Sequence, residues 1–228
     1  MNIEKSETND LIIDFSEYQS GYLDAMKLGS GREADKVVQQ ALDTNIRVNQ
    51  VYLDIFQSTA YEIGRLWQRN EFSVAQEHLA TAIIERQMGD LHSLFKPIKQ
   101  KQKTLVIGCV DKEFHRLGAR MVADFFEQDG WIVYYLGAAV PSKTFIAMAR
   151  EMKADLIGLA SQLIFRLPAI TEFVLELDHS GLGGIPVMVG GLAFVQQPEL
   201  YKTLGVQFSG SDAAEAVRLA NQIIPGNL

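Results

Sequence analysis

The residues best suited to chemistry form three short segments in the second half of the chain. They are Glu113-x-His115-x-x-Gly118, Ser161-Gln162-Leu163 and Gly190-Gly191, separated by 42 and 26 residues. A neutral imidazole is a good ligand for a transition metal, and a carboxylate two residues away can fix its tautomer and raise its basicity. A serine hydroxyl can hydrogen-bond a ligand, and paired glycines leave space where any Cβ would collide with it. The segments therefore make His115 a candidate metal ligand; the structural alternative is that His115 caps a helix and that the glycines only turn the chain.

A second pattern lies in the first half of the chain. Trp67 is followed after nine residues by Glu77-His78, with Thr81 one helical turn further on. A wide indole can cover a flat ligand, and Glu77 and His78 can hydrogen-bond its polar parts. The alternative interpretation is structural: Trp67 fills the core at a helix end, and Glu77 with Thr81 forms a solvated helix face.

The elements that carry the second pattern are predicted to be helices. Segments 15–28 and 32–42 are amphipathic and are joined by Gly29-Ser30-Gly31, which is a helix stop. A fourth segment, 73–95, begins with Ser73 and has Gln76 three residues later, as in a capping box. The third segment places six residues on one face at steps of three and four: Val48, Tyr52, Ile55, Thr59, Ile63 and Leu66. Four such helices predict a small bundle.

After about residue 104 the pattern changes to alternating strands and helices. The predicted strands are 105–110, 131–136, 156–160, 187–189 and a weaker one at 206–209, and the predicted helices between and after them are 117–128, 143–153, 169–177 and 213–223. This alternation predicts an α/β fold, namely a Rossmann-like (flavodoxin-like) parallel sheet with helices on both faces. Ligands of such sheets bind at the carboxyl ends of strands, which is where all three segments fall. The expected domains are a polar tail (1–13), a four-helix bundle (14–95), a linker (96–104) and the α/β domain (105–228).

Composition limits the classes of function. The formal charge is −7, from 21 basic and 28 acidic residues, which argues against direct nucleic-acid binding. The basic cluster Lys96, Lys99, Lys101 and Lys103 is interpreted as a solvated linker. No apolar run is long enough to span a bilayer, and the polar N-terminus lacks the features of a secretory signal. With one cysteine, Cys109, no internal disulfide can form, so we expect a cytoplasmic protein.

The three segments resemble the base-off, His-on cobalamin-binding signature. The resemblance implies that His115 is the lower axial ligand of cobalt and that Glu113 supports it, although the signature more often begins with Asp. It also implies that Gly118 admits the bulky group, that Ser161 hydrogen-bonds the displaced nucleotide base, that Leu163 belongs to the cofactor site, and that Gly190-Gly191 leave space for the nucleotide tail. The loop Gly137-Ala138-Ala139-Val140-Pro141 is similar to the family's loop beside the corrin ring, which places Val140 in the site.

The Trp67 and Glu77-His78 pattern resembles the W-x9-EH motif of light-sensing cobalamin proteins, the CarH and LitR repressors and the related AerR antirepressors. The resemblance implies that adenosylcobalamin lies between the helical cap and the α/β domain, with Trp67 over the upper corrin face. Light would then release the adenosyl group and change either self-association or binding to a protein partner, such as a regulator or kinase. In some members a His follows the Trp and replaces the upper ligand, whereas here Gln68 follows it.

Other functions remain open at this point. A corrinoid methyl carrier for a methyltransferase system also pairs a helical cap with this domain, but its upper face must open, which suits a bulky Trp67 poorly. A mutase domain would require a separate substrate-binding subunit, and a cobalamin store is a further alternative. The sequence has no nucleophile motif, phosphate loop or zinc cluster, and Asp111 lacks a partner carboxylate. We therefore expect a light sensor that binds and signals, not an enzyme.

Overall fold

A computed structural model describes residues 13–95 and 99–224 of the chain. The expected polar tail, apart from residue 13, and the start of the expected linker lie outside the described residues, as do residues 225–228. The chain divides into two compact units, Met1–Ile84 and Glu85–Leu228, and the boundary falls inside one helix, α5. The domain limits expected from the sequence stay a prediction.

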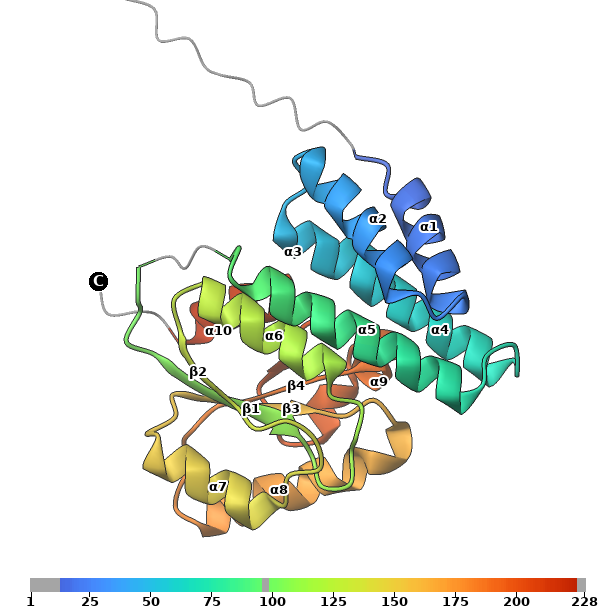
Figure 1. Cartoon of the computed structure of the whole chain (residues 1–228). Coiled ribbons are helices and arrows are strands. Elements are labelled where there is room, and N and C mark those ends of the chain that lie inside the picture. Colours follow the sequence, from blue (N-terminus) through green and yellow to red (C-terminus); the bar gives the residue numbers. More distant parts are fainter. Residues whose placement is uncertain (1–12, 96–98, 225–228) are drawn as a thin grey trace, which may run out of the picture. The chain divides into compact units, whose positions relative to one another are not determined.

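The first unit is helical, as predicted. Its elements are α1 (Ser16–Lys27), α2 (Gly31–Asp43), α3 (Val48–Gln50), a π-helical segment η1 (Val51–Gln57), α4 (Ser58–Gln68) and the start of α5 (Val74–His92) (Figure 1). The helix stop is confirmed, because Gly29 has a φ of 63° and the Ser30 hydroxyl accepts a hydrogen bond from the Glu33 amide at 3.3 Å. Within residues 13–95 and 99–224, no helix has the length and apolar character needed to cross a membrane.

The capping box predicted for α5 is also confirmed. The Ser73 hydroxyl accepts from the backbone N–H of Gln76 at 3.2 Å, while the side-chain oxygen of Gln76 accepts from the backbone N–H of Ser73 at 2.9 Å. Two amides at the start of the helix are thereby satisfied reciprocally. These bonds fix where α5 begins, and so fix the positions of Glu77 and His78 in its first turns.

The third predicted helix differs from expectation in its middle. Residues Val51–Gln57 form a π-helix, whose wider turn shifts the side chains that follow it. Val48, predicted to be on the apolar face, is only half-buried, whereas Val51 and Phe56 are fully buried. The Phe56 ring packs 5.3 Å from that of Tyr22, measured between centroids. The π-helical turn therefore brings two further side chains into the core of this unit.

The second unit contains a five-stranded parallel sheet, in the order β2-β1-β3-β4-β5. The strands are β1 (Thr104–Cys109), β2 (Ile132–Tyr135), β3 (Leu156–Ala160), β4 (Val187–Gly190) and β5 (Phe208–Ser209), and the main helices are α6 (Leu117–Gln128), α7 (Ser142–Glu151), α8 (Leu167–His179) and α10 (Ala213–Ile223). The α/β fold with a helical N-terminal part is thus the one predicted. The strand order changes direction between β1 and β3, which is where ligands of doubly wound sheets bind.

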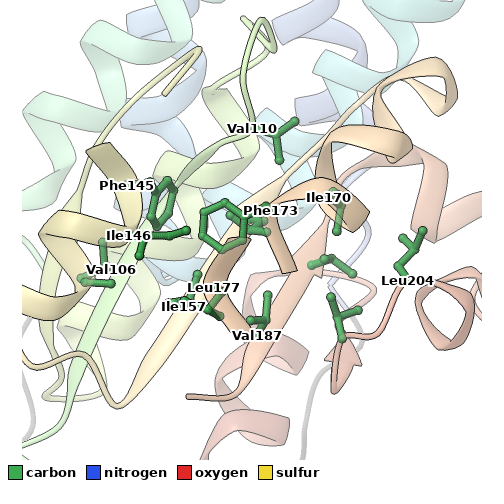
Figure 2. Close-up of a cluster of buried hydrophobic side chains, with 14 of the residues drawn as sticks. Val106, Val110, Phe145, Ile146, Ile157, Ile170, Phe173, Leu177, Val187 and Leu204 are labelled. Atoms are coloured by element: carbon green, nitrogen blue, oxygen red, sulfur yellow. The ribbon is translucent and has the colours of Figure 1, made fainter. Parts of the chain in front are cut away.

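Both faces of the sheet are covered by helices. Alternate residues of β1 point to opposite faces, so Leu105 and Ile107 pack with α6 and α10, while Val106 packs with α7 and α8. Figure 2 shows the second of these clusters, in which Phe145 of α7 and Phe173 of α8 meet with their ring centroids 5.2 Å apart. Burial on both faces explains why the strands read as continuous apolar runs in the sequence.

A polar cluster closes the edge of the sheet at which the strands begin. The Lys101 ammonium donates to Asp129 at 2.6 Å and to Asn221 at 3.2 Å, and the Asn221 amide donates to Asp129 at 2.8 Å. The indole of Trp131 also donates to Asn221 at 3.4 Å. We call these four residues the amino-edge cluster. It joins the segment before β1, the start of β2 and the end of α10.

Three short helices were not predicted. They are η2 (Ile164–Arg166), α9 (Leu192–Gln196) and η3 (Leu200–Thr203). They are too short for a helical period to be read from the sequence. The first two begin within four residues of the ends of β3 and β4, so they shape the edge of the sheet where the strands end.

Candidate functional site

The structure brings the three sequence segments of the second unit together at the carboxyl ends of the strands. The Val110 amide donates to the Ala160 carbonyl at 3.2 Å, just before the first and second segments begin, and the Ser161 amide donates to the Gly190 carbonyl at 2.9 Å, which joins the second segment to the third. The loop after β2 joins the same edge, because the Ala139 amide donates to the carbonyl of Glu113 at 2.8 Å. The site therefore lies at the point where the strand order reverses.

The centre of this site is the pair Glu113 and His115. One oxygen of the Glu113 carboxyl accepts from the His115 amide at 3.0 Å and contacts the imidazole Nδ1 at 2.5 Å. The other oxygen accepts from the backbone N–H of Gln162 at 2.9 Å. The Glu113 side chain is 1% exposed, whereas that of His115 is 51% exposed. A buried carboxyl thus holds an imidazole that projects from the end of the sheet, and bridges β1 to β3.

Electrostatics decide which ring nitrogen is available to a metal. Burial by itself raises the pKa of Glu113, but hydrogen bonds from His115 and the Gln162 amide more than offset it, so the pKa lies below its ordinary value. An ionised carboxylate can only accept hydrogen bonds, so the proton of a neutral imidazole is on Nδ1. The nitrogen that can coordinate a metal is then Nε2 of His115, with Glu113 as the outer partner that fixes its tautomer.

The glycines of the site have different physical roles. Gly191 has a φ of 120°, and a Cβ there would lie 2.1 Å from the carbonyl oxygen of Ser161, so the protein's own backbone requires this glycine. A Cβ on Gly190 or Gly118 would meet no atom within 4 Å. These two positions, unlike Gly191, are ones where a side chain would take up space open to a ligand.

Ser161 and Leu163 occupy the end of β3. Ser161 is fully buried, and its hydroxyl donates to the Leu163 carbonyl at 3.4 Å, while Leu163 is half-buried. Val140, from the loop after β2, is half-buried, and its amide donates to the Cys109 carbonyl at 3.2 Å. To donate a hydrogen bond to a ligand, the Ser161 hydroxyl would therefore have to exchange its carbonyl partner, whereas it can accept one without that exchange.

Sequence reasoning missed several features of this edge. Gln162 lies within the second segment, but only the three-dimensional structure shows its role. Its backbone N–H donates to Glu113, and its side-chain oxygen accepts from the backbone N–H of Leu192 at 3.1 Å. Phe114, Ile164 and Phe165 are 71%, 52% and 67% exposed. Phe114 is next to His115 in the chain, and Ile164 and Phe165 lie in η2, after β3. Exposed apolar side chains of this kind are suited to contact a large, partly apolar ligand. No periodic signal marks them, since all lie in loops or a single short turn.

The predicted residues of the helical half lie in the first unit. Trp67, in the last turn of α4, is 47% exposed, so it does not fill the core. The half-buried Glu77 contacts Nδ1 of His78 at 2.5 Å and accepts from the Thr81 hydroxyl at 3.1 Å. Glu77, His78 and Thr81 therefore form one hydrogen-bonded group on α5.

Comparison with known protein families identifies the domain that carries this site. The family model described as a B12 binding domain matches residues 103–218, which include the whole carboxyl edge. The chain belongs to the B12 binding domain family. A second model, also described as a B12 binding domain, matches residues 18–91 in the helical half. Both halves of this B12 binding protein thus correspond to cobalamin-binding modules.

Individual relatives fall into two groups. Dimethylamine corrinoid protein 1 of Methanosarcina acetivorans is 26% identical over 166 residues, covering 72% of this chain and 77% of that protein. The HTH-type transcriptional repressor CarA of Myxococcus xanthus is 28% identical over 150 residues, covering 66% of this chain and about half (51%) of that repressor. The solved monomethylamine corrinoid protein of Methanosarcina barkeri has the same fold, with a TM-score of 0.81, 16% identity, and coverage of 92% of this chain and 100% of that one.

Replacing Glu113 by Gln tests the support of the imidazole. Each oxygen of Glu113 accepts from a donor, so an amide must turn its NH₂ group toward either His115 or Gln162 and lose one of these bonds. Cobalamin affinity should fall by about 10- to 100-fold, the usual loss for an outer partner of a metal ligand. An absorbance titration of the purified protein measures it. Asp111→Asn, the same change two residues earlier, is the control, and equal affinities for the two variants would contradict the assignment.

The thiol of Cys109 is expected to be unreactive in the folded protein. Burial, and then the charge of Glu113, raise the pKa of Cys109 from 9.0 to about 12. The thiolate is the reactive form, so iodoacetamide at pH 9 should label the unfolded chain and leave the native chain unlabelled, as read by mass spectrometry. Because only the unfolded thiol ionises between pH 9 and about 12, the free energy of unfolding should decrease over that range. Complete labelling of the native chain at pH 9 would show that Cys109 is accessible.

Proposed function

We propose that this protein is a corrinoid methyl carrier, which binds cobalamin through Nε2 of His115 and serves a methyltransferase partner. The observation that carries the cobalamin-binding part of the proposal is the buried Glu113 carboxyl holding His115 at the strand ends. The methylamine corrinoid proteins among its relatives favour the carrier, which the sequence alone had ranked below a light sensor. The carrier itself is not the enzyme in this scheme.

The residues of the carboxyl edge fit a corrinoid. His115 supplies the lower ligand, and Glu113 keeps its proton on Nδ1. Gly118 and Gly190 lie where a Cβ would meet nothing, which suits a bulky group and its nucleotide tail, and Phe114 supplies apolar surface next to the ligating imidazole. When bound, the corrinoid supplies a cobalt ion that can receive a methyl group and give it up again. The protein's own contribution is to bind and orient that group.

The light sensor is the second candidate, and a specific observation favours it. Trp67 is exposed to 47%, and Glu77, His78 and Thr81 form a polar group, as expected if they cover and bind an upper adenosyl ligand. The similarity to the repressor CarA points the same way. In this alternative the ligand is adenosylcobalamin and the partner is a regulator, a kinase or a second copy of the chain.

One experiment separates the two candidates. The full chain is loaded in the dark with methylcobalamin or adenosylcobalamin, and absorption and sizing profiles are recorded before and after green light. The carrier should retain methylcobalamin, keep its elution volume after illumination, and transfer the methyl group in the dark to a thiol acceptor when a purified corrinoid-dependent methyltransferase is added. Exclusive retention of adenosylcobalamin, with a light-dependent change of elution volume, would overturn the carrier and support the sensor.

A further inference from the structure

We propose that Glu85 and Arg116 are positioning residues, which hold the loop carrying His115 so that its imidazole meets cobalt. The inference rests on the proposed function, since it assumes that His115 is the lower ligand. Arg116 follows His115 directly in the chain, and Glu85 lies on α5, 31 residues away. Both residues belong to the second unit.

The contact between them is two-pronged. Nε of Arg116 donates to one oxygen of Glu85 at 2.8 Å, and a terminal nitrogen donates to the other at 2.9 Å. A parallel pair of charge-assisted bonds fixes orientation as well as distance, unlike a single contact. Exposed ion pairs contribute little to stability in general, and the two side chains are 52% and 27% exposed. The expected role of this pair is therefore geometric and not a large part of the folding free energy.

The main chain of Arg116 is fixed as well. Its carbonyl accepts from the Tyr135 hydroxyl of β2 at 3.3 Å and from the Arg120 amide of α6 at 3.0 Å. Arg116 thus contacts β2 and α6 through its backbone and α5 through its side chain. Because Arg116 is held by three elements, the backbone of the adjacent residue His115 has little room to move.

His115 lies between two such anchors. Before it, the Glu113 carboxyl holds its amide and its Nδ1. After it, Arg116 is held as described, and the thiol of Cys109 lies 3.7 Å from the His115 carbonyl. The Glu113 contact fixes the Nδ1 side of the imidazole ring. The Glu85–Arg116 pair restrains the other end of the segment, which sets the direction of Nε2.

The test uses Glu85→Gln and Arg116→Gln, with the double charge exchange Glu85→Arg/Arg116→Glu as rescue. The control is Arg86→Gln/Asp90→Asn, which removes an exposed ion pair of 2.8 Å from the same helix. Each full-length protein is labelled with ¹⁵N-histidine and loaded with cobalamin reduced by one electron. The isotope changes the electron paramagnetic resonance splitting only where histidine is the lower ligand. Amide hydrogen exchange of residues 113–118 is measured on the ligand-free proteins.

The single variants should show a smaller histidine-ligated fraction, cobalamin dissociation about 10-fold faster, and faster exchange of the loop amides. The charge exchange should restore part of each signal, and the control should match the wild type. If the wild type is histidine-ligated and both single variants match the control in all three measurements, the positioning role is wrong while the proposed function stands. If cobalt in the wild-type complex is ligated by the benzimidazole of cobalamin, the binding mode in the proposed function is overturned, and this inference with it.

Discussion

His115→Ala is expected to abolish imidazole ligation and to weaken cobalamin binding by at least about 100-fold, because losing an outer partner alone costs 10- to 100-fold. Nε2 of His115 is the ring nitrogen directed away from the Glu113 carboxyl, and the side chain is half exposed at the end of the sheet. The expected result is a spectrum with cobalamin's own benzimidazole on the metal, and loss of the pigment during gel filtration. Absorbance titration gives the affinity.

The matched control is His179→Ala, at the exposed C-terminal end of α8. It removes an imidazole without touching the carboxyl edge, so it should bind cobalamin as the wild type does. Apo His115→Ala should keep its circular dichroism spectrum, since the removed side chain is half exposed and lies in a loop. Undiminished retention of cobalamin by His115→Ala, with benzimidazole on the metal, would remove the basis of the proposed site.

Gly191→Ala should destabilise the folded protein by about 3 kcal/mol or more, from left-handed backbone strain and a forced shift in a packed segment. The new Cβ would collide with the Ser161 carbonyl, which is main chain and cannot rotate away. Because Ser161 is itself hydrogen-bonded to Gly190, moving it disturbs β3 and β4 together. Urea unfolding of the ligand-free protein, read by circular dichroism, measures the loss.

The neighbouring glycine provides the contrast. Gly190→Ala meets no atom within 4 Å, so its effect on unfolding should stay within about 0.5 kcal/mol. Gly190→Val should also fold, yet bind cobalamin more weakly, because its side chain enters the space left for the ligand. Equal stability of Gly191→Ala and Gly190→Ala would contradict the backbone role of Gly191, and full affinity of Gly190→Val would place the ligand elsewhere.

Much of the fold could be predicted because periodicity and end signals agree in this chain. The limits of α6 and α10 are those predicted, and the Ser73 capping box starts α5. The π-helix at Val51–Gln57 was missed because its seven residues are too few to show a wider period in the sequence. The helix α9 was missed because five residues contain too few turns to show a period.

The residues of the candidate site could be predicted from the sequence, but the hydrogen bonds between them could not. Motif spacing pointed to Glu113 and His115, and strand order brings them to the edge where β3 ends. That Glu113 also binds the Gln162 amide depends on the adjacency of β1 and β3, which only topology establishes. The Glu85–Arg116 contact joins residues 31 positions apart with no local pattern. The preference for the carrier over the sensor came from sequence similarity to relatives, since a helical N-terminal part is compatible with both functions.

The amino-edge cluster has a practical consequence. Lys101, Asp129 and Asn221 meet where β1 begins, and His115 follows the end of the same strand, a separation of about 20 Å for its six residues. Changes this far apart usually combine additively. Substitutions that raise thermal stability at the amino-edge cluster and substitutions that change cobalamin affinity near His115 could therefore be selected separately and then combined in one protein.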